Sequence, residues 1–283
     1  MEIWETPQIK QLIRRAISED HVRHDVTTKA LIPQVQKGKA SIIAKANGII
    51  AGTKISKQVF REVDPTLQVA INIQDGSAVK PGDVIAVITG KISSILKAER
   101  VALNFMQRLS GIASTTASYV QAVKGLRVQI MDTRKTTPGL RILEKYAVRA
   151  GGGKNHRMNL ADGLLIKDNH IAAVRSQGLS IKEIVAKARE EASPELTIEI
   201  EVKTQDEAAQ AADAGANIIL LDNMTPEQMR QAVELISGRA LTEASGGINM
   251  ENVRSVAETG VDRISIGALT HSPKALDISL ELD

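Results

Sequence analysis

The C-terminal half of the chain alternates short apolar runs with helical segments, and this rhythm constrains the fold more than any other feature. Beyond Arg127 the apolar runs are VQIM, LLI, TIEI, NIILL, ALT and RISI. A helical segment of about 10–15 residues separates most of them, which is typical of a parallel sheet and most simply of a (β/α) barrel. Only these six units are visible, fewer than the usual eight. We therefore predict a barrel that is incomplete or that borrows an element from elsewhere in the chain.

Local signals mark where several helices begin and end. Thr6, followed by Pro, suits the cap of an N-terminal helix. Residues 225–228, Thr-Pro-Glu-Gln, have the pattern of a capping box, and Gly238 suits the end of the helix that this box opens. Residues 98–124 predict a long, Ala-rich helix that is interrupted near Gly111.

The region between the first helix and this long helix has a different pattern. Residues 38–90 carry short apolar runs broken by Gly, Asn and Pro, which predicts strands joined by tight turns. Within them, residues 75–83 (DGSAVKPGD) are similar to the turn of lipoyl and biotinyl carrier domains. Those domains need a lysine flanked by Met or Asp at a hairpin tip, and none is present here. We interpret the segment as a structural hairpin.

The composition excludes several classes of function. The chain has no Cys, so disulfides and thiolate metal sites are impossible. Aromatic residues make up 2% of the chain, which argues against a base-stacking platform for nucleic acid. A formal charge of +3 is too small to indicate a nucleic-acid or membrane partner. The N-terminus lacks the apolar region of a signal peptide, and no stretch approaches the roughly 18 apolar residues of a membrane span, so we expect a cytoplasmic protein.

Polar or glycine residues follow every predicted strand of the C-terminal half. In a parallel barrel these strand ends meet on one face, where such enzymes place their chemistry. The alternative is that these residues are ordinary loop starts, but ionised groups beside buried runs are costly unless something pairs with them. The residues are Asp132 to Lys135, Lys167 to His170, Glu201 to Lys203, Asp222 and Asn223, Glu243 with Ser245 to Gly247, and Gly267 with Ala268.

The sign of these charges changes along the chain. Between Asp132 and His170 there are ten Lys, Arg or His residues against four Asp or Glu, so the early units favour an anionic ligand. Glu201 and Asp222 lie on later units and suit sugar hydroxyls or a hard cation such as Mg²⁺. Their alternative role is an ion pair with neighbouring lysines. The cations that we expect to face the anion are Arg134, Lys135, His156, Arg157 and Lys167.

Glycine segments follow the last two strands. Ser245-Gly246-Gly247 and Gly267 stand where barrels often bind phosphate through backbone N–H groups. Residues 151–153 are three further glycines that suit either a flexible loop or a place of close approach. They lack the spacing of a Walker loop or a dinucleotide fingerprint.

Several long segments of the chain match the motifs of one known enzyme family. They are ERVALNFMQRLSGIAS (99–114), DTRKTTPGLRILEKYAVRAGGGKNHR (132–157), LLIKDNH (164–170), IILLDNM (218–224), EASGGI (243–248) and ISIGALTHS (265–272), with ED and DVTT near the N-terminus. These segments resemble the carboxylating nicotinate-nucleotide pyrophosphorylase (quinolinate phosphoribosyltransferase) family. The resemblance implies an α/β fold with an N-terminal open-sheet α/β sandwich, residues 1–109, and an incomplete TIM-like (β/α) barrel, residues 110–270. It also implies that the tail, residues 271–283, packs back on the first domain.

The resemblance also implies residue roles. The enzymes of this family make nicotinate mononucleotide, carbon dioxide and pyrophosphate from quinolinate and phosphoribosyl pyrophosphate, for de novo NAD synthesis. They form homodimers, or hexamers as trimers of dimers, and Arg100 would be donated in trans. The two quinolinate carboxylates would be held by Arg134, His156, Arg157 and Lys167. Phosphoribosyl pyrophosphate and its Mg²⁺ would be surrounded by Lys135, Glu201, Asp222, Ser245, Gly246, Gly247, Gly267 and Ala268, and Thr133 is a further expected substrate-binding residue.

Three of these residues would take part in the chemistry. Glu201 and Asp222 would stabilise positive charge at the sugar and hold the metal, and Lys135 or water would protonate the intermediate. One rival is a paralogue of the same fold that is found with molybdate transport genes and need not use quinolinate. Another is a non-catalytic sensor that binds phosphoribosyl pyrophosphate and releases no carbon dioxide.

Overall fold

The structure, a computed structural model, describes residues 3–175 and 178–283. The chain divides into two compact units. Unit 1 comprises residues 1–117, 137–152 and 272–283, and unit 2 comprises residues 118–136 and 153–271. The division differs from the expected boundary at residue 109, because residues 110–117 and 137–152 group with unit 1. None of the described helices combines the length and apolar character that a bilayer crossing requires.

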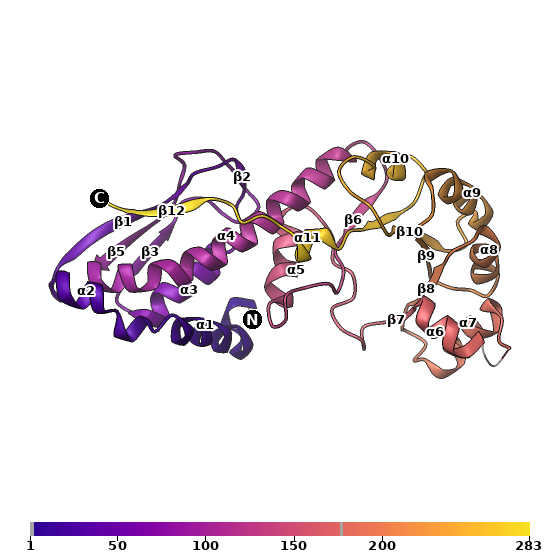
Figure 1. Ribbon diagram of the computed structural model, residues 1–283, viewed down its shortest axis with the longest axis horizontal. Helices are drawn as coiled ribbons and strands as arrows, with labels where there is room; N and C mark the ends of the chain where they lie inside the picture. The colour runs from indigo at the N-terminus through magenta and orange to yellow at the C-terminus, as the bar shows by residue number, and fades with distance from the viewer. Residues whose placement is uncertain (1–2, 176–177) are drawn as a thin grey trace. The chain divides into compact units, whose positions relative to one another are not determined.

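Unit 1 is built on an antiparallel sheet of four strands in the order β12-β1-β5-β3. The last strand of the chain, β12, pairs with β1, and Figure 1 shows these two segments side by side. A separate two-stranded ladder joins β2 to β4. The strands are β1 (Lys37–Ala44), β2 (Gly48–Ile49), β3 (Gln68–Ile71), β4 (Ala78–Val79), β5 (Val84–Lys91) and β12 (Ile278–Leu282).

The helices of unit 1 follow local capping signals. Thr6 accepts a hydrogen bond from the backbone N–H of Ile9 and Pro7 opens the helix, which confirms the predicted N-terminal helix. Asp75 accepts hydrogen bonds from the backbone N–H groups of Gly52 and Thr53, so the segment 75–83 holds the start of α3. The hairpin predicted for this segment is wrong, because β4 pairs with β2 whereas β5 pairs with β1 and β3. The elements are η1 (Ile3–Glu5), α1 (Pro7–Glu19), η2 (Val22–His24), α2 (Val26–Leu31), α3 (Thr53–Val63), α4 (Ile92–Ala122, whose last turn enters unit 2) and α5 (Arg141–Ala150).

The expected interruption of the long helix at Gly111 is wrong. Helix α4 continues through this residue. A Cβ added at Gly111 would lie 2.0 Å from the carbonyl oxygen of Lys274, so the glycine lets the C-terminal tail cross the helix closely. Gly151 has the same function, since a Cβ there would lie 2.3 Å from the carbonyl oxygen of Ala113. Gly111 therefore marks a close backbone contact rather than a helix break, whereas Gly151 combines a close contact with the C-cap of α5.

Unit 2 contains the parallel sheet that the alternating pattern predicts. Its six strands have the order β6-β11-β10-β9-β8-β7, with every pair parallel. The end strands β6 and β7 do not pair with each other, so the barrel is incomplete, as expected. The strands are β6 (Gln129–Met131), β7 (Leu164–Ile166), β8 (Ile198–Val202), β9 (Ile218–Asp222), β10 (Leu241–Ser245) and β11 (Arg263–Ser265).

The helices of unit 2 alternate with these strands along the chain (Figure 1). Thr225 forms the predicted capping box with Gln228 at the start of α9, and Gly238 follows the helix with a φ of 74°. The helices are α6 (Asp168–Arg175), α7 (Ile181–Glu191), α8 (Gln205–Asp213), α9 (Pro226–Ile236), α10 (Val253–Ala257) and α11 (Ala268–His271).

Strand periodicity fixes which side chains face the barrel interior. Successive residues of a strand point to opposite faces, so Glu199 and Glu201 of β8 share one face. The ladder register places Glu201 beside Leu220, and Leu220 beside Glu243 of β10. Asp222 pairs with Ser245 one layer nearer the carboxyl ends. Polar side chains from neighbouring strands therefore meet inside unit 2.

Candidate active site

A cavity of about 600 Å³ opens at the carboxyl ends of the parallel strands. It lies entirely within unit 2. Eleven of the residues predicted from the sequence line it: Thr133, Arg134, Lys135, His156, Arg157, Lys167, Glu201, Asp222, Ser245, Gly246 and Gly247. The remaining lining residues are Leu165, Leu220, Asn223, Glu243 and Ser265.

Two arginines give the cavity its cationic side. The Nε atoms of Arg134 and Arg157 are buried and have no hydrogen-bond partner among the described residues. One terminal nitrogen of Arg157 donates to the carbonyl oxygen of Gly163 at 2.8 Å. Burial, and then the charge of Arg134, lowers the pKa of Arg157 below its ordinary value. Two neighbouring guanidinium groups with unsatisfied donors are arranged to bind an anion.

The loop that carries Arg157 is anchored by a buried aspartate. Asp132 follows β6, is fully buried, and accepts the backbone N–H of His156 at 2.8 Å and the side-chain amide of Asn155 at 2.5 Å. The Nδ1 atom of His156 accepts the backbone N–H of Arg157 at 2.8 Å. Its Nε2 atom lies 2.9 Å from Glu199. Both ring nitrogens of His156 are therefore engaged by the protein, although the side chain lines the cavity.

Two carboxylates form the acidic side. Glu201 accepts the backbone N–H of Asp168 at 3.1 Å, and the Nζ atom of Lys167 lies 3.8 Å from it. Glu201 therefore does form the ion pair with a neighbouring lysine that was the alternative role for this residue. The distance to Lys167 is too long for a direct hydrogen bond. Asp222 accepts the side-chain amide of Asn223 at 2.8 Å. These carboxylates lie on neighbouring strands, and both face the cavity.

The turn after β10 is shaped by two glycines in the left-handed region. Gly246 has a φ of 88° and Gly247 a φ of 62°, conformations that residues with a Cβ adopt only with strain. A Cβ on Gly246 would lie 2.2 Å from the Oδ1 atom of Asn223. Bare backbone therefore faces the cavity at Ser245-Gly246-Gly247, as a phosphate-binding turn requires.

Gly267 and Ala268 do not line the cavity, and Gly267 lies against Lys135. A Cβ on Gly267 would lie 3.0 Å from the Cδ atom of Lys135, so the glycine leaves room for the lysine side chain. The hydroxyl of Thr270, on the short helix that begins at Ala268, donates to the Lys135 carbonyl oxygen at 2.8 Å. These contacts set the path of Lys135 toward the cavity.

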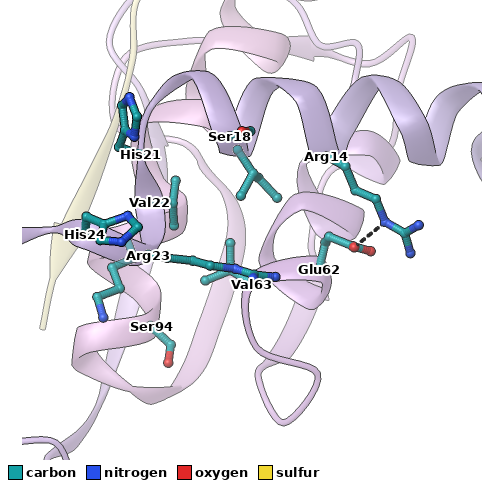
Figure 2. A pocket seen from close by; sticks show the side chains of 11 residues that line it. Arg14, Ser18, His21, Val22, Arg23, His24, Glu62, Val63 and Ser94 are labelled. Carbon is teal, nitrogen blue, oxygen red and sulfur yellow. Dashed lines mark hydrogen bonds and ion pairs between the residues drawn. The ribbon is translucent and has the colours of Figure 1, made fainter.

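Arg100 belongs to helix α4 in unit 1, whereas the cavity lies in unit 2. Its side chain is 58% exposed, and its guanidinium lies 3.7 Å from the adjacent Glu99. A further cavity of about 760 Å³ lies in unit 1. Arg14 and Glu62 form an ion pair at 2.6 Å on one side of it, and His21 and His24 lie on the opposite side in the view of Figure 2. None of the residues predicted for the site lines it.

Sequence reasoning missed one interior carboxylate and misplaced another. Glu199 went unnoticed, and Glu243 was expected after its strand, whereas it lies within β10 and is fully buried. The strand period could have identified Glu199. Every second side chain of a strand points to the same face, and Glu199 stands two residues before Glu201. The acidic side of the cavity therefore reaches deeper into the barrel than the strand ends.

An incomplete parallel barrel with its cavity at the strand ends places this chain among the α/β-barrel enzymes. Residues 112–281 match the family described as "Quinolinate phosphoribosyl transferase, C-terminal domain", and residues 25–110 match the corresponding N-terminal domain. The chain belongs to the quinolinate phosphoribosyltransferase family.

Individual relatives agree with this assignment. The chain is 45% identical to a probable nicotinate-nucleotide pyrophosphorylase [carboxylating] of Bacillus subtilis, over 97% of this chain and 93% of that protein. It is 43% identical to the decarboxylating quinolinate phosphoribosyltransferase 2b of Nicotiana tabacum, over 98% of this chain and 83% of that protein. The crystal structure of NadC from Streptococcus pyogenes matches with a TM-score of 0.93 and 44% identity, covering 98% of each chain.

Proposed function

We propose that this protein joins quinolinate to phosphoribosyl pyrophosphate and releases nicotinate mononucleotide, carbon dioxide and pyrophosphate, a step of de novo NAD synthesis. The names of the relatives, carboxylating pyrophosphorylase and decarboxylating phosphoribosyltransferase, support this reaction. The observation that carries the proposal is the pair of buried, unpartnered Nε atoms on Arg134 and Arg157. A buried donor without an acceptor costs about 1–3 kcal/mol, and a dianionic substrate would remove that cost.

The geometry of the cationic side supports a clamp for two adjacent carboxylates. A guanidinium presents parallel N–H donors that match a carboxylate, and two neighbouring guanidinium groups match a dicarboxylate. Lys167 lines the same cavity and adds a third positive charge. His156 contributes by holding the backbone of Arg157, because its own ring nitrogens are already hydrogen-bonded. A monocarboxylate such as nicotinate would leave part of this charge uncompensated.

The acidic side supports chemistry at the sugar. The pyridine nitrogen would bond to the anomeric carbon while the bond to pyrophosphate breaks and the leaving oxygen takes the electron pair. Glu201 and Asp222 would stabilise the positive charge that develops on the sugar and orient its hydroxyls. The ring nitrogen becomes cationic, so the 2-carboxylate can leave as carbon dioxide while its bonding electrons stay on the ring carbon. Lys135 or water would then donate a proton to that carbon.

The residues present fit a bound Mg²⁺. Mg²⁺ favours one or two carboxylates beside phosphate oxygens and keeps several waters. Glu201 and Asp222 supply two such carboxylates on adjacent strands, next to the bare turn at Ser245 to Gly247. When bound there, the ion would neutralise the charge of the departing pyrophosphate.

We also propose that the protein forms a homodimer, or a hexamer built as a trimer of dimers, in which Arg100 reaches the active site of a partner subunit. The exposed side chain of Arg100 and its long contact with Glu99 leave its charge available for such a role. A cytoplasmic location, expected from the sequence, stays a prediction.

The test is carbon dioxide release from quinolinate labelled at its 2-carboxylate. We expect release that requires phosphoribosyl pyrophosphate, with one nicotinate mononucleotide formed for each carbon dioxide, and no turnover of nicotinate. Binding of phosphoribosyl pyrophosphate without release would favour the non-catalytic sensor. Turnover of a different pyridine in preference to quinolinate would favour the transport-linked paralogue.

A further inference from the structure

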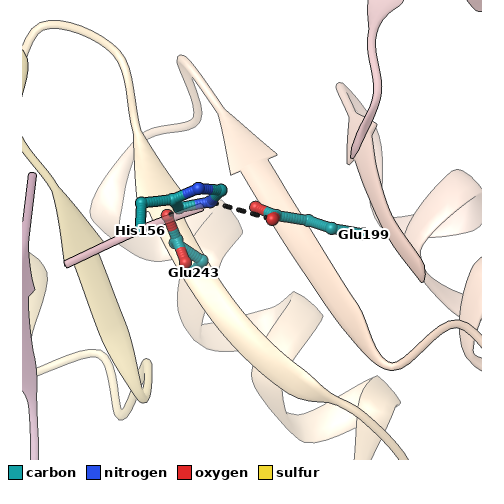
Figure 3. Close-up of side chains that lie close together, drawn as sticks. All are labelled: His156, Glu199 and Glu243. Atoms are coloured by element: carbon teal, nitrogen blue, oxygen red, sulfur yellow. Dashed lines mark ion pairs between the residues drawn. The ribbon is translucent and has the colours of Figure 1, made fainter. Parts of the chain in front are cut away.

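Two buried glutamates lie beside His156 inside the barrel of unit 2. The Nε2 atom of His156 is 2.9 Å from Oε2 of Glu199 and 3.7 Å from Oε1 of Glu243. Figure 3 shows the imidazole between the two carboxyl groups, which come from β8 and β10. Glu243 is fully buried, and Glu199 is 4% exposed. The assigned chemistry of the cavity uses neither glutamate.

The hydrogen bonds of His156 determine its tautomer. The backbone N–H of Arg157 points at Nδ1 across 2.8 Å, so Nδ1 must present a lone pair. The ring proton is then on Nε2, which donates it to Glu199. An imidazolium would place two donors against each other at Nδ1. A metal held by His156, Glu199 and Glu243 is also disfavoured, because coordination would need a lone pair on Nε2.

The two carboxyl groups carry too much negative charge for their surroundings unless one of them is neutral. Both oxygens of Glu243 and Oε1 of Glu199 are buried without a hydrogen-bond partner among the described residues. The potential ligand atoms of the three side chains lie within 4.8 Å of one another. A proton on Glu243 would remove the charge repulsion between the two carboxyl groups and make a donor of one of its unpaired oxygens. In the same direction, burial and the charge of Glu199 raise the pKa of Glu243 to about 7.

We propose that Glu243 holds a proton, which leaves Glu199 as the acceptor of the Nε2–H, and that the two glutamates form a positioning pair that fixes His156 as the neutral Nε2–H imidazole. His156 in turn holds the amide of Arg157 and sets where that guanidinium enters the cavity. The inference rests on the proposed function, since it gives Arg157 the task of binding a carboxylate. Both glutamates act through His156, although Glu243 also lines the cavity.

Two other contacts of the loop that carries His156 and Arg157 do not hold the imidazole ring of His156, which leaves that task to the glutamate pair. Asp132 fixes the backbone N–H of His156 at 2.8 Å, and Gly163 accepts from the Arg157 guanidinium at 2.8 Å. Other groups thus hold the backbone of His156 and the far end of the Arg157 side chain, whereas the backbone N–H of Arg157 is held by Nδ1 of His156. On the side away from Nδ1, the contact between Glu199 and Nε2 holds the rotation and tautomer of the imidazole, with Glu243 3.7 Å from the same nitrogen.

The first test reads the tautomer directly. The protein, labelled with ¹⁵N in its five histidines, is observed by NMR without substrate at pH 7, and the His156 signals are assigned by their loss in His156→Gln. We expect an unprotonated Nδ1 and a protonated Nε2. In Glu199→Ala we expect these signals to shift toward exchange between tautomers. An imidazolium, or a proton on Nδ1, in the unsubstituted protein would overturn the proposal.

The second test separates positioning from a general structural role. Glu199→Ala should raise the KM for quinolinate at least tenfold and change the KM for phosphoribosyl pyrophosphate less than twofold. Glu199→Gln should recover most of the loss, because its amide oxygen can accept from Nε2–H. Glu243→Gln should likewise recover most of the loss seen in Glu243→Ala, since a carboxamide imitates the protonated acid. Glu227→Gln, on the exposed face of α9, is the control that should match the unsubstituted protein.

The outcomes distinguish this inference from the proposed function. If the unsubstituted protein does not turn over quinolinate, the proposed function fails, and the NMR signals of the free protein still decide the tautomer. If turnover is normal but Glu199→Ala matches the control, the positioning pair is refuted. Equal loss in Glu199→Gln and Glu199→Ala, both folded, would also refute it. Should Glu199→Ala fail to fold, the comparison of Glu243→Gln with Glu243→Ala and the tautomer remain decisive.

Discussion

The backbone N–H of Asn223 donates to the carbonyl oxygen of Ser245 at 2.9 Å and ties the end of β9 to the glycine turn that follows β10. Asn223 adopts the left-handed region with a φ of 56°, and its side-chain amide donates to Asp222 at 2.8 Å. Asn223 thus links the carboxylate of Asp222 to the glycine turn at Gly246 by hydrogen bonds. A change in the turn should reach Asp222 through Asn223.

Gly246→Ala should therefore weaken the binding of phosphoribosyl pyrophosphate by more than the strain of a positive φ alone predicts. The new Cβ would lie 2.2 Å from Asn223, whereas Gly215, with a φ of 80°, has no atom within 4 Å of such a Cβ. Gly215→Ala is thus the matched control for the cost of a positive φ, on the order of 1 kcal/mol. We expect Gly246→Ala to raise the KM for phosphoribosyl pyrophosphate at least tenfold, measured by initial rates. Equal behaviour of the two variants would argue against coupling between the turn and Asn223.

Arg134→Ala and Arg157→Ala should each lower kcat/KM for quinolinate at least 100-fold, about 3 kcal/mol, while the fold survives. Each substitution removes one of the two guanidinium groups that are proposed to bind the carboxylates of quinolinate. Arg134→Lys should be intermediate, because it keeps the charge and loses the paired donors. Steady-state kinetics and thermal melting check both points. Arg230→Ala on the exposed face of α9 is the control, and normal turnover in either clamp variant would refute the clamp.

The stability of the protein should fall as pH rises through the pKa of Glu243. Glu243 faces His156, Glu199, Arg263 and Ser265, and burial raises its pKa from 4.5 to about 7 in the folded state. The folded protein then binds the proton more tightly than the unfolded chain. This contribution to stability is complete below pH 4.5 and is lost as pH rises through about 7, with a loss on the order of 2 kcal/mol between pH 5 and pH 8.

Glu243→Gln should remove this component of the pH dependence. Urea unfolding at pH 5 and pH 8 should show that the variant gains stability relative to the unsubstituted protein as pH rises. Glu258→Gln, at an exposed ion pair with Arg254, should follow the unsubstituted protein at both values. Parallel curves for all three proteins would mean that Glu243 is not protonated in the folded state.

Hybrid dimers should test donation of Arg100 in trans. Arg100→Ala and Lys135→Ala subunits should each be nearly inactive alone. After subunit exchange, one of the two sites in a hybrid dimer would combine an intact Arg100 with an intact Lys135, so mixing should restore up to about one quarter of the activity, given half hybrids with one intact site each. Native mass spectrometry verifies the exchange. Verified hybrids without activity would contradict the shared site.

Local sequence patterns were sufficient for the elements and for most of the cavity lining. Thr6 and the box at residues 225–228 cap helices as predicted, since capping depends on residues three or four positions apart. The interruption at Gly111 was wrong, because its reason is the carbonyl of Lys274, which is distant in sequence. A glycine in a helical pattern signals either a break or a close contact, and only the partner segment distinguishes them.

The sequence by itself determined the alternating strands and helices, the six-unit parallel sheet, and the set of charged residues at the strand ends. These follow from periodicity and from the rule that parallel strands finish on one face. Only the tertiary structure decided that Glu199 and Glu243 both lie beside His156. It also decided that the Nε atoms of Arg134 and Arg157 have no hydrogen-bond partner among the described residues, and that Gly246 lies close to the side chain of Asn223. Contacts of this kind depend on strand register and on side-chain packing between distant segments, and neither has a local signature in the chain.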